Sequence, residues 1–120
     1  MTQLAIPSNG SLKITVDHSG QDAIVRLSGQ INIHSSPDLR DSLQAILSTE
    51  PLPRAVTVDL AGVYYIETSG IATLIEALRV ARRHQIGFCL QGLSGSVLRL
   101  FEVTGTLMLF DPGGRGEKAS

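Results

Sequence analysis

The segment between residues 56 and 78 changes the spacing of its apolar residues partway along, and this change limits the folds open to the chain. Val56, Val58 and Leu60 alternate with polar residues, a period of two that predicts a strand with one buried face. From residue 71 the apolar residues are three or four apart, which predicts an amphipathic helix. These helical residues are Ile71, Leu74, Ile75 and Leu78.

Two strands and a helix are predicted before this segment. Leu12, Ile14 and Val16 alternate with polar residues, which predicts a strand with one buried face. Residues 23–27 form an apolar run close behind it, and the turn sequence from His18 to Asp22 between them favours an antiparallel hairpin. Ser36 suits a helix N-cap, Pro37 the first helical position and Asp38 the first turn, so we expect a helix over about residues 37–47. Because this helix separates the hairpin from the strand at residue 56, that connection is predicted to be a crossover.

Three more elements are predicted after residue 85. Ile86, Phe88 and Leu90 alternate as a strand, Ser94 caps a helix, and residues 107–110 form a short last strand. The predicted order β-β-α-β-α-β-α-β indicates an α/β fold, a mixed sheet of about five strands with helices packed on it. We assign residues 12–110 to this domain, residues 1–11 to an N-terminal extension and residues 111–120 to a flexible C-terminal tail.

The charge balance and the composition argue against several classes of function. Ten basic and eleven acidic residues give a net charge of −1, so we expect no direct nucleic-acid binding. No stretch of the sequence approaches the roughly 18 apolar residues of a membrane span, so we also expect no membrane insertion. Three histidines and one cysteine make a tetrahedral zinc site hard to assemble, and we expect no metal and no cofactor. The single Cys89 and the absence of a signal sequence favour a cytoplasmic location.

Two segments look like enzyme motifs but lack essential parts. Gly92 and Ser94 match the start of a nucleophile elbow, yet Ser96 stands where the second glycine is required. The tail sequence PGGRGEK has the glycines and the lysine of a phosphate-binding loop without its spacing or its following helix. Because no nucleophile, base and orienting group can be named together, we predict that the chain is not an enzyme.

The residues Glu67 to Gly70 lie between the strand at residue 56 and the helix that follows it. Partners and ligands tend to bind at such loops, beyond the carboxyl ends of strands. Thr68 or Ser69 would present a hydroxyl there. One interpretation is an N-cap, which stabilises a protein by about 1 kcal/mol. The other is a phosphorylation site, where the phosphate adds about −1.5 to −2 charges, favoured by the helix N-terminus and opposed by Glu67.

Three segments of the chain resemble a known family. They are VRLSGQIN, VTVDLAGVYYIETSGIATLIEALRVAR and LSGSVLRLFEVTGTLMLF. They resemble the STAS domain in its anti-sigma factor antagonist form, also called the anti-anti-sigma factor, over about residues 12–110. The resemblance implies a STAS-like sheet covered by helices, without enzymatic activity. It also implies a regulator that, when unphosphorylated, binds an anti-sigma factor serine/threonine kinase, releases a sigma factor for transcription, and is restored by a metal-dependent protein phosphatase.

The resemblance also assigns roles to individual residues. It places the phosphoacceptor at Thr68, with Ser69 as the alternative, and puts Asn32 where many relatives carry an aspartate that faces the kinase. The implied partner-binding residues are Asn32, His34, Ser35, Ser36, Glu67, Ser69, Gly70 and Ile71. Some relatives with threonine at the acceptor position belong to stress-signalling assemblies, and others are subunits of lipid-transporting ABC systems. A non-enzymatic subunit of such an assembly is therefore the alternative function.

Overall fold

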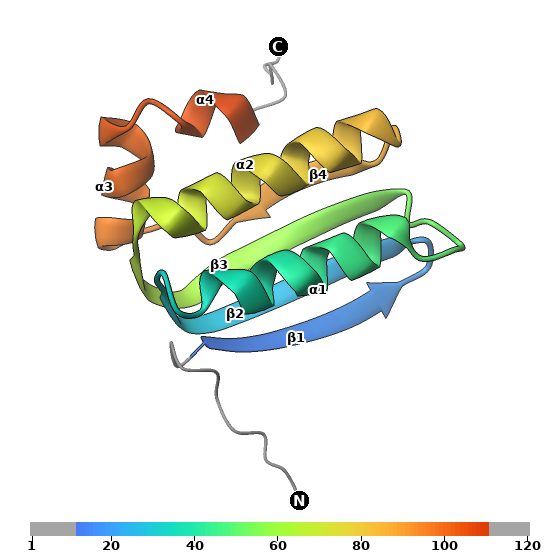
Figure 1. Cartoon of the computed structure of the whole chain (residues 1–120), viewed down its shortest axis with the longest axis horizontal. Helices are drawn as coiled ribbons and strands as arrows, with labels where there is room; N and C mark the ends of the chain where they lie inside the picture. The colour runs from blue at the N-terminus through green and yellow to red at the C-terminus, as the bar shows by residue number, and fades with distance from the viewer. Residues whose placement is uncertain (1–11, 111–120) are drawn as a thin grey trace, which may run out of the picture.

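The computed structural model describes residues 12–110, which fold into four strands and four helices (Figure 1). In chain order they are β1 (Leu12–Ser19), β2 (Asp22–Ile31), α1 (Ser36–Ser48), β3 (Ala55–Ile66), α2 (Thr68–Arg83), β4 (Gly87–Gln91), α3 (Gly95–Val103) and α4 (Leu107–Phe110). The predicted N-terminal extension, residues 1–11, and the predicted flexible tail, residues 111–120, lie outside the described residues.

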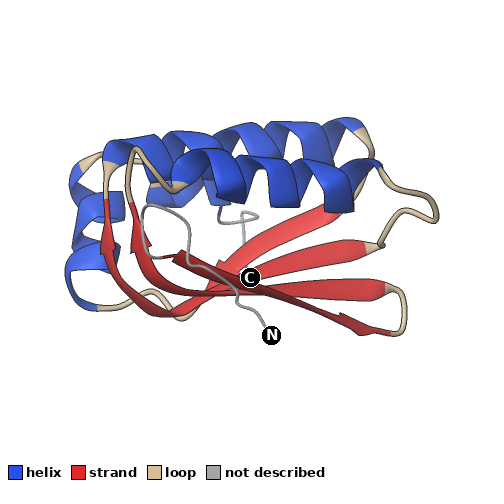
Figure 2. Ribbon diagram, turned by 60° about the horizontal axis from the view of Figure 1, so that its bottom comes forward, coloured by secondary structure: helices blue, strands red, loops and turns tan. Residues whose placement is uncertain are grey.

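The four strands form one mixed sheet in the order β1-β2-β3-β4. β1 and β2 pair antiparallel around a two-residue turn, whereas β2 with β3 and β3 with β4 pair parallel. The two long helices α1 and α2 lie side by side over one face of this sheet, and none of the described elements covers the other, open face (Figure 2). The predicted α/β fold, the hairpin and the crossovers are therefore confirmed.

The hydrophobic core lies between the sheet and these two helices. β2 and β3 contribute alternate side chains, among them Val25 and Val58, and both are fully buried. The helices contribute apolar stripes that include Leu39, Leu43 and Leu74, which are fully buried as well. Burial of each such side chain stabilises the fold by about 1.5–3 kcal/mol. This packing fixes how the helices sit on the sheet and therefore where their first turns lie.

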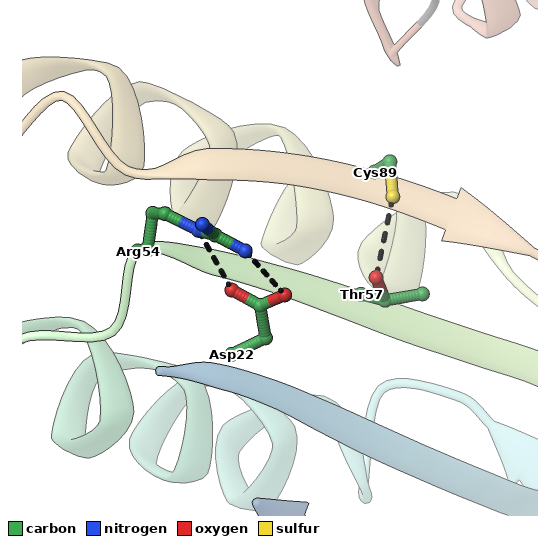
Figure 3. Close-up of polar contacts among 4 residues, drawn as sticks. All are labelled: Asp22, Arg54, Thr57 and Cys89. Carbon is green, nitrogen blue, oxygen red and sulfur yellow. Dashed lines mark hydrogen bonds and ion pairs between the residues drawn. The ribbon is translucent and has the colours of Figure 1, made fainter. Parts of the chain in front are cut away.

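The open face of the sheet carries polar side chains. At one end Arg54 pairs with Asp22, with Nε–Oδ1 and Nη2–Oδ2 distances of 3.3 Å, and this contact ties the start of β3 to the start of β2 (Figure 3). On the neighbouring strands β3 and β4, Thr57 Oγ1 and Cys89 Sγ are 3.4 Å apart. Because its outward side chains are polar, this face of the sheet can stay in contact with water while the other face packs against the helices.

β3 is longer than the sequence predicts. The apolar alternation that predicts the strand ends at Leu60, but β3 continues to Ile66. Two register shifts against β2 show that β3 bulges there, and Gly62 is at one of them, where an added Cβ would lie 2.8 Å from Ser28 Cβ. Beyond Leu60 the buried residues Val63 and Ile66 are three apart, so a test for period two does not detect this part of the strand.

The last predicted strand, residues 107–110, is instead the short helix α4. The sequence Leu-Met-Leu-Phe is a continuous apolar run, which fits a buried strand and a helix equally well, and leucine and methionine have high helix propensity. Phe110 packs against Phe101 of α3 and Phe88 of β4, with ring centroids 5.9 Å and 6.4 Å apart. The described sheet therefore has four strands rather than about five.

Candidate functional site

The starts of α1 and α2 lie side by side at the carboxyl ends of β2 and β3 (Figure 1). The hydroxyls of Ser36, the first residue of α1, and Ser69, the second residue of α2, are hydrogen-bonded at 3.2 Å. Neighbouring parallel strands end at the same edge of a sheet, so the loops that follow them open onto one surface. The fold therefore brings together residues 32–36 and residues 67–71, the two segments of the predicted site.

Gly70 allows α2 to begin close to the sheet. A Cβ added at this residue would lie 2.5 Å from Ile31 Cγ2 and 2.9 Å from Ile66 Cγ1. The two isoleucines are the last residues of β2 and β3, and both are buried. Because a close-packed interior leaves them little room to move, the packing itself favours glycine at this position of the Glu-Thr-Ser-Gly sequence.

The Glu67 carboxylate connects the two loops of the site. Its Oε1 accepts a hydrogen bond from the backbone N–H of Ile33 at 3.1 Å, and its Oε2 accepts one from the Tyr65 hydroxyl, also at 3.1 Å. The hydrogen bond to Glu67, and then the charge of Glu67, raise the pKa of Tyr65. Glu67 thus holds the loop that follows β2 against the start of α2.

Asn32 organises the loop between β2 and α1. Its Oδ1 accepts hydrogen bonds from the backbone N–H groups of His34, at 2.9 Å, and Ser35, at 3.1 Å. Its own backbone N–H donates to Ser35 Oγ at 2.9 Å. Side chains of this type form such local bonds and stabilise turns. Asn32 is half-buried by this arrangement, whereas His34 remains exposed.

The hydroxyls predicted as helix caps do not make side-chain cap bonds. The N-cap residue of α1 is Ser35 rather than Ser36, and Ser36 Oγ instead lies 2.7 Å from a carbonyl oxygen of the preceding loop. The N-cap residue of α2 is Glu67, because the helix already begins at Thr68. Ser94 does occupy the N-cap position of α3, but its side chain makes no cap bond. The capping interpretation of Thr68 and Ser69 is therefore wrong.

Thr68 and Ser69 differ in exposure. Thr68 is exposed, and its hydroxyl makes no hydrogen bond with another residue of the range 12–110. Ser69 is half-buried and bonded to Ser36 at 3.2 Å. Four of the predicted partner-binding residues are buried, namely Ser35, Ser36, Gly70 and Ile71. Buried residues of this kind shape a surface without lining it.

Three exposed aromatic or aliphatic side chains near the motif are absent from the predicted site. Ile33, Tyr64 and Tyr65 are 66%, 64% and 44% exposed. Together with Thr68, Ile33 and Tyr65 line a hollow of about 590 Å³ that residues of α3, including Leu100, complete. The sequence does offer one sign of these exposed residues: the only two tyrosines of the chain, Tyr64 and Tyr65, stand just before the Glu-Thr-Ser-Gly motif, with Ile66 between them and Glu67.

The hollow is lined by four residues that carry hydroxyls, one carboxylate and apolar side chains. Glu67 is the only charged residue that lines it in the described structure. Across residues 12–110, no group of three or more His, Cys, Asp or Glu side chains is placed to hold a metal ion. No helix in the same range is long and apolar enough to cross a membrane. Exposed apolar side chains that gather around a polar group are typical of a protein-binding surface.

Comparisons with known proteins identify the family. A family profile described as "Mlab, STAS domain" matches residues 14–107, and the chain belongs to the STAS domain family. The anti-sigma-B factor antagonist of Listeria monocytogenes is 27% identical to it over 96 residues, which cover 79% of this chain and 82% of the relative. The chain is thus a STAS domain similar to anti-sigma factor antagonists.

Solved structures of anti-sigma factor antagonists share the fold. An anti-sigma factor antagonist from Mycobacterium paratuberculosis superposes with a TM-score of 0.73 at 20% identity, and the match covers 88% of this chain and 87% of that one. The anti-sigma factor antagonist SpoIIAA in its unphosphorylated form gives a TM-score of 0.69 at 15% identity over 80% of this chain and 84% of that one. The phosphorylated form of SpoIIAA from Bacillus gives 0.63 at 15% identity over 82% and 87%.

Proposed function

We propose that this STAS domain is a phosphorylation-controlled anti-sigma factor antagonist. In its unphosphorylated form it binds an anti-sigma factor serine/threonine kinase and so releases a sigma factor for transcription. The kinase phosphorylates Thr68, and a metal-dependent protein phosphatase removes the phosphate. The observation that carries the proposal is the exposed hydroxyl of Thr68 at the start of α2, beside exposed Ile33 and Tyr65. Its support from relatives is that proteins of similar fold are antagonists and that SpoIIAA exists in both phosphorylation states.

Thr68 suits the acceptor role better than Ser69. A kinase must align the hydroxyl oxygen with the terminal phosphoryl group of ATP, which requires an accessible side chain. Ser69 would have to leave a half-buried position and break its 3.2 Å hydrogen bond to Ser36. Thr68 has neither obstacle, and Ser69 instead helps to keep the starts of the two helices together.

A phosphate on Thr68 changes the charge of the surface that the partner covers. It adds about −1.5 to −2 charges. The new charge lies next to Glu67, and no lysine or arginine among the described lining residues offsets it. The N-terminus of α2 stabilises the phosphate in part. A partner that covers Ile33 and Tyr65 would have to remove water from the phosphate, so phosphorylation weakens the complex.

Phosphorylation also acts on the contacts of Glu67. Repulsion by the phosphate displaces a carboxylate that accepts hydrogen bonds from the Ile33 N–H and the Tyr65 hydroxyl. Without those bonds the loop that follows β2 loses its contact with Glu67, and the Ser36–Ser69 hydrogen bond is left to hold the start of α1 against α2. The modification therefore alters the shape of the surface as well as its charge.

Phosphorylation by the partner kinase tests the acceptor assignment. The chain is incubated with the kinase and ATP, and its peptides are analysed by mass spectrometry. We expect phosphate on Thr68 in the wild type and in the matched control Ser69→Ala, and none in Thr68→Ala. A Thr68→Ala variant that is phosphorylated elsewhere at the wild-type rate would contradict the assignment.

The exposed apolar area also supports a second candidate function, a non-enzymatic STAS subunit of a stress-signalling assembly or of a lipid-transporting ABC system. In such an assembly Ile33 and Tyr64, now 66% and 64% exposed, would be covered permanently. Co-purification separates the two functions. A kinase that co-purifies supports the antagonist, whereas a transport ATPase or a large assembly of homologous STAS proteins supports the subunit.

A further inference from the structure

Within residues 12–110, β1 is an edge strand of the sheet. Among residues 12–110 the only strand that pairs with β1 is β2, and Figure 1 shows no described element beyond it. Val16 belongs to the set of β1 residues that face the helix side of the sheet, yet it is 37% exposed. Unpaired backbone groups and an exposed apolar side chain along a strand edge form a template for pairing with another strand.

The hairpin geometry determines which backbone groups of β1 face outward. Ser19 and Asp22 flank the two-residue turn and form the first pair of the β1–β2 ladder. In a two-residue hairpin these flanking residues exchange hydrogen bonds, and the bonded pairs then alternate with non-bonded pairs. Odd-numbered residues of β1 therefore bond to β2. The N–H and C=O groups of the even-numbered residues face outward, and these residues are Leu12, Ile14, Val16 and His18.

A second copy of β1 fits this edge in an antiparallel register centred on Thr15. In that register Ile14 bonds to Val16 of the second copy, so outward-facing residues meet outward-facing residues. Lys13 lies directly opposite Asp17 of the second copy, and the two-fold symmetry creates this pair twice. These two residues occupy non-bonded positions, where side chains across the ladder approach most closely. Both are exposed on the open face. Asp17 also pairs there with Arg26 of its own chain, so Lys13 of the second copy would join an existing ion pair.

Neighbouring registers lack this match. Shifting the centre to Ile14 places Lys13 opposite Thr15, and shifting it to Val16 places Asp17 opposite Thr15. Only the register centred on Thr15 pairs the two opposite charges across the strands, which favours it over the others. Lysine on an exposed strand edge generally discourages pairing with other strands. In the register centred on Thr15, Lys13 instead favours pairing because it meets an opposite charge.

We propose that the β1 edge is an interface between two copies of this chain, which pair through β1 in the Thr15-centred register. The pairing joins the two sheets into one continuous sheet and covers Val16. The edge is distinct from the surface around Thr68, so the proposal stands whether or not Thr68 is phosphorylated.

Disulfide trapping tests the register directly. In this register the two Thr15 Cα atoms are about 4.5 Å apart, within the range that a disulfide spans. Ser19 lies on the same face of β1, but its two copies would be about 26 Å apart. Both variants are made in a Cys89→Ser background, because Cys89 is an exposed thiol. We expect Thr15→Cys to form a cross-linked dimer at least about ten times faster than Ser19→Cys. Equal rates would overturn the proposal.

Sedimentation of charge variants provides a second test. We expect the mass of the wild type to rise with concentration from 12.8 kDa toward about twice that value. Lys13→Asp and Asp17→Lys each place like charges across the pair, so each variant alone should remain monomeric. An equal mixture restores opposite charges at both positions of a mixed dimer and should associate. A wild type that stays monomeric up to about 1 mM, or a mixture that fails to associate, would overturn the proposal.

Discussion

The four residues of the Glu-Thr-Ser-Gly sequence have different physical tasks. The Glu67 carboxylate accepts hydrogen bonds from two other segments of the site, and the Ser69 hydroxyl bonds to the first residue of α1. Gly70 provides the space that the ends of two strands need. Only the Thr68 side chain has no bond with another described residue, so it is the member of the motif that a partner or an enzyme reaches first.

Gly70→Ala should destabilise the protein. In an exposed helix interior this change is favourable by about 1 kcal/mol, but here the new methyl group would lie 2.5 Å from Ile31 Cγ2. We expect the free energy of unfolding to fall by about 1–3 kcal/mol, measured by urea denaturation. Gly87→Ala is the control, because its Cβ would meet Ala55 Cβ at 3.3 Å and should cost less. A Gly70→Ala protein as stable as the wild type would contradict the packing argument.

Glu67→Gln should lower the pKa of Tyr65. The hydrogen bond and the charge of Glu67 raise this pKa above its usual value of about 10. Ultraviolet titration in a Tyr64→Phe background isolates the Tyr65 phenolate, and Glu76→Gln on the exposed side of α2 is the control. The midpoint should move down in Glu67→Gln and stay unchanged in Glu76→Gln. Identical titrations in Glu67→Gln and its parent would show that the carboxylate does not act on Tyr65.

The raised pKa of Tyr65 also predicts how the free energy of unfolding changes with pH. The pKa of Tyr65 is higher in the folded state than in the unfolded state, so the unfolded chain releases this proton first as pH rises. The stabilisation is complete below a pH of about 10 and is lost as pH rises through the folded-state pKa. Urea denaturation across this range should show a smaller loss in Glu67→Gln than in the wild type.

At the scale of elements, α4 can be distinguished from a strand by two substitutions. Phe110 is buried against Phe101 and Phe88, whereas Met108 is 80% exposed. Phe110→Ala should lower the free energy of unfolding by about 3 kcal/mol, and Met108→Ala should change it by less than about 0.5 kcal/mol, measured by urea denaturation. In a strand these two residues would share one face. Similar losses in both variants would therefore contradict the helix.

Periodic elements could be predicted from the sequence, whereas elements shaped by long-range contacts could not. Regular spacing was enough for β1, β2, α1 and α2, because each has one continuous apolar face. The second half of β3 was missed since its bulges follow from pairing with β2 and change the spacing of buried residues to three. The helix α4 could not be predicted because its four apolar residues have no period of their own, and Phe101 and Phe88 of two other elements decide how they pack.

The candidate site, too, has parts that the sequence predicts and parts that only the structure reveals. Its motif is contiguous and could be recognised, and so could the loop at Asn32. The contacts of Glu67 with Ile33 and of Ser69 with Ser36 join residues more than 30 positions apart, and no local pattern indicates them. The exposure of Tyr65 depends on the bulged register of β3, so it too required the structure.

At the scale of the whole molecule, a net charge of −1 means that no broad electrostatic field guides a partner to the site. A phosphate of about −1.5 to −2 charges exceeds that net charge at a single point. The control of binding should therefore depend on where a charge is placed and only weakly on the total charge.

Thr68→Glu and Gln44→Glu separate these two possibilities. Each variant adds one negative charge, but Gln44 lies further along α1 and is exposed. By calorimetric titration with the partner kinase, Thr68→Glu should weaken binding at least about tenfold, a loss of about 1.4 kcal/mol. Thr68→Ala and Gln44→Glu should stay within about threefold of the wild type, because exposed charges more than about 10 Å apart are largely screened at ordinary ionic strength. Equal weakening by both glutamates would mean that total charge governs the complex, and equal affinity of Thr68→Glu and Thr68→Ala would remove the charge mechanism at this surface.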